Sequence, residues 1–391
     1  MALTTITRVT GRRVHAAGGA SALEAEVHLR CGASGRAVVP IGARGRTVHD
    51  GVREIATVVD GALHGLDARR AGDVDASLAR LNTYSPMRVG AEVRAACSIA
   101  ALRATAEAAG QPLFRYLQPE AARVPRLMAT TLVAAAPDTA LARLAVVPLA
   151  AAGAEEALDA CAAVHAAVAA ALSRRPDAQH GGIPVFGDDE CGLEALVTAI
   201  ERAGFVPGGE IAIAAELNAA RDDASARGPR GELLARWIER YPIALLEDRF
   251  AALERAPAEP LTRTGFGSLL RVGAAARDAR GAGPRGGAGG QRFCGAIIAA
   301  PEQAGTASEV LAAFEAARRV GWDTAVAADA IGAEDAAAVH LAVGWGAGML
   351  KLGSVADGAS TARWNELLRI DAALARAASH SRPQAAAHRV H

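Results

Sequence analysis

Residues 324–330, "TAVAADA", are a short apolar run that is followed by the helical pattern "AEDAAAVHLAVG". The same order then repeats, because "GMLKLG" (348–353) precedes the helical stretch "STARWNELLRIDAALARAA". Short apolar strands that alternate with helices indicate a parallel sheet that is buried on both faces. These two units therefore predict an α/β fold for the C-terminal part of the chain.

The same alternation extends upstream to about residue 124. "EIAIAAEL" (210–217) precedes the helical stretch "ELLARWIERY", and "YPIALLED" (241–248) comes after it. "CGAIIAA" (294–300) precedes a helix that opens with the capping-box pattern Thr306-x-x-Glu309. The number of such units predicts a TIM-type barrel of the (β/α)8 kind.

The N-terminal part has a different pattern, with strands first and helices afterwards. "ALEAEVHLRC" (22–31) and "GRAVVPIGA" (35–43) read as two strands joined by a turn, and two stretches with helical spacing come next, the second predicted to end at Gly110. We therefore predict an α+β cap domain over residues 1–123, a barrel domain over 124–378 and a disordered tail over 379–391. The glycine-rich stretch 278–292 is predicted to be a loop.

Composition narrows the class of protein. The 391 residues carry no net formal charge, so we expect no nucleic acid and no membrane surface as partner. The five cysteines are scattered and form no CxxC pair, which favours a reduced protein. The first residues lack the apolar core of a secretion signal, and no apolar run is long enough to cross a membrane, so we predict a cytoplasmic location.

Lys351 is the single lysine among 42 lysines and arginines. An ammonium is a compact point charge, whereas a guanidinium is a broad planar fork, so a site that needs the first shape does not accept the second. Lys351 is therefore the first candidate for a catalytic or substrate-binding residue.

Acidic residues follow or end several of the predicted strands. Glu216, Glu247 and Asp329 end three of them, and Asp189 lies in "FGDDECG" (186–192) after another apolar run. Side chains at the carboxyl ends of barrel strands face the active site. Carboxylates brought together there repel one another unless a cation lies between them, and Mg²⁺ prefers such oxygen ligands.

Taken in order, these motifs resemble those of the enolase family, whose enzymes dehydrate 2-phosphoglycerate to phosphoenolpyruvate. "YPIALLED" is similar to the family's "YPI…IED", "GMLKLGS" to its "IKTGS", and "WNELLRID" to its "YNQLIRIE". The resemblance runs from about residue 8 to about residue 375. It implies an α+β cap on a modified barrel of ββαα(βα)6 order, a homodimer, two Mg²⁺ ions and lyase chemistry.

By this resemblance, only some of the ligands of the family's first metal site have matching residues in this chain. Glu247 matches one metal-binding carboxylate directly, and Glu216 matches an aspartate with a side chain one methylene shorter. The third carboxylate falls where this chain has Ala274 and Ala275, with Asp278 nearby but out of register. We therefore expect Mg²⁺ to bind weakly or not at all.

Other family residues are also replaced. Lys351 matches the family's lysine that contacts substrate charge, whereas Ala300 stands where the family has its lysine base. Arg44 stands in place of a lid serine and Arg143 in place of a glutamate. Asp189, with Glu190 shifted by one residue as the alternative, corresponds to the glutamate that acts on the leaving hydroxyl.

Without that base the chain is not expected to be a competent glycolytic enolase. One hypothesis is a repurposed carbon–oxygen lyase that acts on a small acidic substrate, with Lys351, Arg44 and Arg143 as anion-binding residues and Asp189 or Asp329 as the acid or base. The alternative is a catalytically inactive relative that acts as a binding or scaffold protein. In either case we expect Arg143 or Arg44 to form an ion pair with Glu216 or Glu247.

Overall fold

The computed structural model describes most of the 391 residues. The described ranges are 2–42, 45–83, 89–135, 139–172, 179–180, 182–218, 227–248, 270–274, 296–301, 305–319, 321–329 and 333–381. Arg44, Ala275, Asp278, Cys294 and the glycine-rich stretch 278–292 lie outside them.

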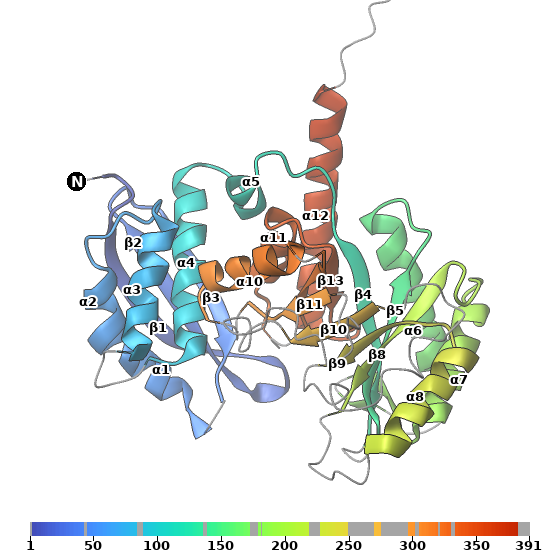
Figure 1. Cartoon of the computed structure of the whole chain (residues 1–391). Coiled ribbons are helices and arrows are strands. Elements are labelled where there is room, and N and C mark those ends of the chain that lie inside the picture. Colours follow the sequence, from blue (N-terminus) through green and yellow to red (C-terminus); the bar gives the residue numbers. More distant parts are fainter. Residues whose placement is uncertain are drawn as a thin grey trace, which may run out of the picture.

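The N-terminal domain is a three-stranded antiparallel sheet with helices packed on it (Figure 1). Its strands are β1 (Ile6–His15), β2 (Ser21–Leu29) and β3 (Ser34–Pro40), in the order β1-β2-β3. β2 and β3 confirm the two predicted strands, and helix α4 packs against both. The helices are α1 (Val48–Glu54), the π-helical turn η3 (Ile55–Val59), α2 (Asp60–Leu63), α3 (Ala71–Thr83), α4 (Ala91–Ala108) and α5 (Leu113–Leu117).

Strand β1 is not predicted from the sequence, and its burial explains why. Only Ile6 and Val9 of its ten residues are buried. It lies at the edge of the sheet, so its other side chains need not be apolar. The predicted end of α4 is confirmed, because Gly110 comes just after it with a φ of 64°, the left-handed conformation that favours glycine at such a position.

In the C-terminal domain, eight of the described strands form a closed ring. Their order around it is β4-β5-β8-β9-β10-β11-β12-β13, and β13 pairs with β4 to close it. β5 is antiparallel to both of its neighbours, whereas the other neighbouring pairs are parallel. These strands are β4 (Arg126–Ala134), β5 (Leu141–Pro148), β8 (Ile211–Leu217), β9 (Ile243–Asp248), β10 (Leu270–Ala274), β11 (Ala296–Ala299), β12 (Asp323–Ala328) and β13 (Met349–Leu352).

Helices connect these strands and surround the barrel (Figure 1). Two helices separate β5 from β8, and single helices follow β8, β11, β12 and β13, so the described elements agree with the order ββαα(βα)6 everywhere except after β9 and β10, where the next residues lie outside the described ranges. The predicted fold class is confirmed. The helices are α6 (Ala154–Leu172), α7 (Asp189–Arg202), α8 (Arg227–Arg240), α10 (Ala307–Arg319), α11 (Ala337–Gly344) and α12 (Gly358–Ser381), with the short hairpin β6 (Gln179–His180) and β7 (Ile183–Phe186) beside β4.

Two predictions about element ends can be compared with the structure. The capping box at Thr306 is confirmed, because its backbone N–H donates to Glu309 and its hydroxyl accepts from the Glu309 N–H. The predicted start of the tail is three residues too early, because α12 continues to Ser381. The rest of the tail lies outside the described residues.

The cap domain is docked at the carboxyl ends of β11 and β12. In the first turn of α10, which comes after β11, backbone N–H groups donate to Ser98 and Asp75 of the cap. After β12, Asp335 accepts from the backbone N–H of Val38 at 2.8 Å and forms an ion pair with Arg103. The cap therefore lies at the end of the barrel where the strand-end acids are found.

Candidate functional site

The interior of the barrel is packed with small and medium apolar side chains. Alternate residues of each strand point inward, so the interior rows can be followed along the strands. Ala212 and Ala214 lead to Glu216, Leu245 leads to Glu247, Ala325 and Ala327 lead to Asp329, and Met349 leads to Lys351. The charged residues therefore continue the apolar rows of the core, at the carboxyl ends of the strands.

Lys351 is the centre of this charged group. Its Nζ lies 2.6 Å from Glu216 Oε2, 2.7 Å from Glu247 Oε2 and 3.3 Å from Asp329 Oδ2. Its side chain is only 3% exposed, and the side chains of Glu247 and Asp329 are as deeply buried. The single lysine is thus a buried cation surrounded by three carboxylates.

Arg143 joins the same group from β5. Its Nη1 lies 2.7 Å from Asp329 Oδ2 and 3.8 Å from Glu216 Oε2. The ion pair that the sequence predicts between Arg143 and Glu216 is therefore present, although Asp329 is the closer partner. We call these five residues, Lys351, Arg143, Glu216, Glu247 and Asp329, the mouth cluster.

The charges of the mouth cluster do not cancel. Three carboxylates and two basic groups leave a formal charge of −1. Removing the proton from Lys351 would leave three buried carboxylates around a neutral amine, which is electrostatically unfavourable. The three carboxylate contacts therefore favour the ammonium over a free amine, which is the form that a general base would need.

Both carboxylate oxygens of Asp189 already accept hydrogen bonds from the protein backbone. It is the first residue of α7, and its two carboxylate oxygens accept the backbone N–H groups of Ala140 and Leu141, each at 2.9 Å. These bonds hold the start of β5, two residues before Arg143. The structure therefore gives Asp189 a positioning contact, while its predicted catalytic role stays a prediction. Its neighbour Glu190 accepts from Trp237 Nε1 at 3.1 Å.

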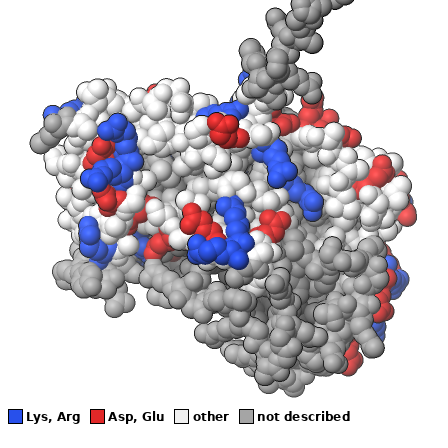
Figure 2. Space-filling view, turned by 45° about the horizontal axis from the view of Figure 1, so that its top comes forward, with Lys and Arg blue, Asp and Glu red and all other residues white. Residues whose placement is uncertain are grey.

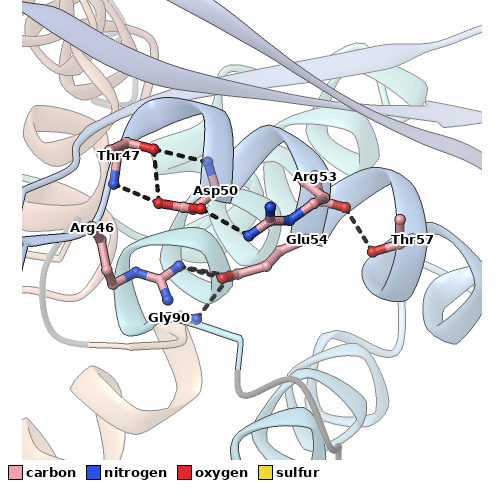
Figure 3. A network of polar contacts seen from close by, with 7 residues as sticks. All are labelled: Arg46, Thr47, Asp50, Arg53, Glu54, Thr57 and Gly90. Carbon is pink, nitrogen blue, oxygen red and sulfur yellow. Dashed lines mark hydrogen bonds and ion pairs between the residues drawn. The ribbon is translucent and has the colours of Figure 1, made fainter.

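Arg44 lies outside the described residues, but its neighbours on the C-terminal side are described. Arg46 forms an ion pair with Glu54 at 2.7 Å, and Glu54 also accepts the backbone N–H of Gly90 (Figure 3). Thr47 and Asp50 then form a capping box that starts α1. The chain is thus anchored two residues beyond Arg44, and the predicted substrate-binding role of Arg44 stays a prediction.

The mouth cluster does not fit the divalent metal that the resemblance implies. Glu216 and Glu247, the two predicted metal ligands, both bind the ammonium of Lys351. β10 ends at Ala274, where the resemblance expects the third carboxylate. Among the described residues, no group of three or more His, Cys, Asp or Glu side chains has the arrangement of a metal site. While Lys351 occupies the centre, a metal ion would compete with it for the same oxygens.

The position of the expected base is also described. Ala300 comes directly after β11 and packs against the apolar interior of the barrel. A methyl group there can neither accept nor donate a proton. The base that the resemblance implies is therefore absent from this strand end.

Sequence reasoning missed one polar group at the mouth. Thr130 lies on β4, two residues beyond Met128, which faces the barrel interior and is the register partner of Lys351. Its side chain is buried, and its Oγ1 has no hydrogen-bond partner among the described residues. The strand "ATTLVAAA" reads as apolar, and only strand alternation could have marked Thr130 as an inward-facing hydroxyl.

The charges on the drawn surface indicate a function less clearly than the mouth cluster does. On the face drawn in Figure 2, acidic and basic side chains of the described residues lie next to one another. Among the described cysteines, Cys31, Cys97, Cys161 and Cys191, none forms a disulfide with another. Within the described ranges, no helix has the length and hydropathy needed to span a membrane.

Comparison with known families agrees with the architecture. The chain matches the enolase N-terminal domain over residues 6–117. It matches the enolase C-terminal TIM barrel domain over residues 133–388. The two matches cover the three-stranded cap and nearly all of the barrel.

Proposed function

The chain belongs to the enolase family, and from this membership we propose that it binds a small acidic molecule at a metal-independent barrel mouth and does not catalyse the family's metal-dependent dehydration. The observation that carries the proposal is the position of Lys351. Its ammonium is bound by both predicted metal ligands and by Asp329. Lys351 and Arg143 together bring the same positive charge as one divalent ion.

The absence of a base on the expected strand supports the same proposal. Abstraction of a proton next to a carboxylate needs a base as well as positive charge that stabilises the product. Ala300 cannot provide the base, and Lys351 is held in its protonated form by three carboxylates. Binding is therefore better supported than dehydration.

Arg143 is the residue through which an acidic ligand would enter. Its side chain is 38% exposed, whereas those of Asp329 and Glu216 are 2% and 11% exposed. A guanidinium carries five N–H groups in a planar fork that matches a carboxylate. A ligand carboxylate approaching from solvent would bind this fork and compete with the protein's own acids for it.

The proposal can be tested with a panel of small carboxylates and thermal denaturation in the presence of EDTA. At least one carboxylate should raise the melting temperature of the wild type equally with EDTA and with Mg²⁺. Arg143→Met should abolish that increase, whereas Arg240→Met should retain it, because Arg240 contacts Glu190 and Glu194 on the barrel exterior. Turnover of 2-phosphoglycerate that requires Mg²⁺ would contradict the proposal.

A carbon–oxygen lyase is the second candidate, and the position of Asp329 favours it. Asp329 comes directly after β12, at the end of the barrel where catalytic groups lie, and contacts both Lys351 and Arg143. In an elimination its carboxylate would accept the proton from the carbon next to the substrate carboxylate, the two cations would stabilise the developing charge, and the hydroxyl on the adjacent carbon would leave as water after taking up a proton from solvent. Exchange of that carbon-bound hydrogen with deuterated water, lost in Asp329→Asn, would support a lyase over a binding protein.

The assembly and location implied by the family stay proposals. We propose a homodimer, which sedimentation of the full chain can test, and a cytoplasmic location. The four described cysteines, which form no disulfide with one another, suit a reducing compartment.

A further inference from the structure

Three carboxylate oxygens surround the point that Lys351 Nζ occupies. They lie at 2.6, 2.7 and 3.3 Å from it and come from three different strand ends, Glu216, Glu247 and Asp329. Calcium binds oxygen ligands at about 2.3–2.6 Å, whereas magnesium demands about 2.0–2.1 Å and near-ideal octahedral geometry. The three distances are those of hydrogen bonds and ion pairs from an ammonium, so an ion in its place would need the oxygens to move inward, less for calcium than for magnesium.

Thr130 provides an independent observation at the same place. Its side chain is buried, with 5% of the residue exposed, and its hydroxyl oxygen has no hydrogen-bond partner among the described residues. Strand alternation places it on the inward side of β4, next to β13, which carries Lys351. A buried hydroxyl without a partner costs free energy, and a hard cation is one group that such an oxygen can bind.

We propose that Lys351 is an internal counter-ion in a latent divalent-cation site formed by Glu216, Glu247, Asp329 and Thr130, and that its ammonium keeps calcium-sized ions out. This inference rests on the proposed metal-independent mouth, and it identifies the group that makes the mouth metal-independent. It differs from the implied family site in its third carboxylate, because Asp329, directly after β12, takes part and the end of β10 does not.

The charges give the direction of the effect. With Lys351 in place the mouth cluster carries a formal charge of −1. Replacing the lysine by a neutral side chain leaves −2, and a divalent ion at the same point brings the cluster to zero. Loss of the ammonium should therefore create a cation site, since its oxygens come from rigid strand ends and Arg143 still holds Asp329 in place.

The test compares wild type with Lys351→Met by calorimetric titration with Ca²⁺ and with Mg²⁺. We expect no saturable binding to wild type. For the variant we expect one Ca²⁺ site with a dissociation constant on the order of 10⁻⁵–10⁻³ M and weaker Mg²⁺ binding. Ca²⁺ should also raise the melting temperature of the variant, and adding Thr130→Val to it should weaken Ca²⁺ binding.

Arg363→Met is the matched control. Arg363 is also a buried cation, but it donates to the backbone carbonyls of Ala333 and Asp335. Its loss should lower stability, and Ca²⁺ should not restore it. Restoration of both variants by Ca²⁺ would overturn the inference, because it would show a general ion effect.

The outcomes separate this inference from the proposed function. Tight Ca²⁺ or Mg²⁺ binding by wild type would contradict both. A folded Lys351→Met protein that binds neither ion would overturn the latent site alone. If this variant does not fold in EDTA, refolding in Ca²⁺ supports the inference. If it folds in neither, Lys351→Gln, whose amide can still donate to a carboxylate and which removes none of the proposed ligands, takes its place, and a folded Lys351→Gln protein without Ca²⁺ binding overturns the inference.

Discussion

Two ion-pair networks in this chain differ in how their charges are balanced. In the cap domain, Glu54 is paired with Arg46 and with the backbone N–H of Gly90, next to the capping box that starts α1 (Figure 3). In the barrel, the mouth cluster gathers three carboxylates around Lys351 and carries net charge. The first network joins one acid to one base, whereas the second depends on a single ammonium.

This difference separates a structural network from a candidate site. A protein that needs only stability gains little from burying a lysine among three carboxylates, because desolvation offsets most of their attraction. The pair in the cap fixes the connection between α1 and α4 and needs no further explanation. The mouth cluster lies at the end of the barrel where ligands bind, and its lysine is bound by the two carboxylates that the resemblance predicts as metal ligands.

The largest expected effect is on the mouth cluster itself. Lys351→Met, in the absence of divalent ions, should lower the free energy of unfolding by about 3–5 kcal/mol, because it leaves buried carboxylates without their cation. Denaturant titration at pH 7 measures this loss. Lys351→Arg retains the charge but changes its shape, so it should cost less, about 1–3 kcal/mol from overpacking. Equal stability of the methionine variant and wild type would remove the distinction between the two networks.

A smaller loss is expected in the cap. Glu54→Gln removes the charged partner of Arg46, whose side chain is 23% exposed and therefore keeps some hydration. The free energy of unfolding should fall by about 2 kcal/mol, with no change in Ca²⁺ or carboxylate binding. The same denaturant titration, combined with the ligand panel, measures both. A change in ligand response would show that the cap network takes part in the site.

Two neighbouring threonines of β4 sharpen the comparison further. Thr131 Oγ1 donates to the carbonyl of Ala129 at 3.1 Å, so Thr131→Val should cost about 1 kcal/mol. Thr130→Val removes a hydroxyl that has no partner among the described residues, so stability should stay the same or rise. Paired denaturation curves test the contrast. A larger loss from Thr130→Val would mean that its hydroxyl is bonded in solution.

The smallest effect concerns a partly exposed pair on the outside of the barrel. The hydrogen bond from His340, supported by Arg369, lowers the pKa of Glu366 from 4.5 to about 2. A lowered pKa in the folded state means that the pair stabilises the protein above pH 4.5 and that this contribution is lost as pH falls from 4.5 toward 2. The stability difference between wild type and Glu366→Gln should therefore shrink over that range. A difference that is independent of pH would contradict the assignment.

Much of the fold is predictable from local sequence patterns. The apolar strands, the capping box at Thr306 and the glycine after α4 each have a local cause, and each was found. β1 was missed because an edge strand needs few apolar residues. The antiparallel direction of β5 came only from the family resemblance, because direction depends on contacts far apart in sequence.

The candidate site could be predicted only as a list of residues. Lys351, Glu216, Glu247 and Arg143 were found from residue type, strand position and the family resemblance, and Asp329 was found as a strand-end acid. Their convergence on one ammonium was not predicted, because it depends on the stagger of three strand ends around the closed barrel. Asp189 was named from its position after an apolar run and from the family resemblance; its carboxylate accepts backbone N–H groups at the start of β5, and its catalytic role stays a prediction.

The most direct test of a buried ammonium at the barrel mouth uses the fact that this chain has one lysine. Lysine-selective ¹⁵N and ¹³C labelling would give a single side-chain signal, which nuclear magnetic resonance can follow with pH and with added Mg²⁺. The structure predicts an ammonium signal that exchanges slowly with water at pH 7 and does not change when Mg²⁺ is added. A rapidly exchanging or neutral amine, or a signal that shifts as Mg²⁺ saturates a site, would contradict the metal-independent mouth.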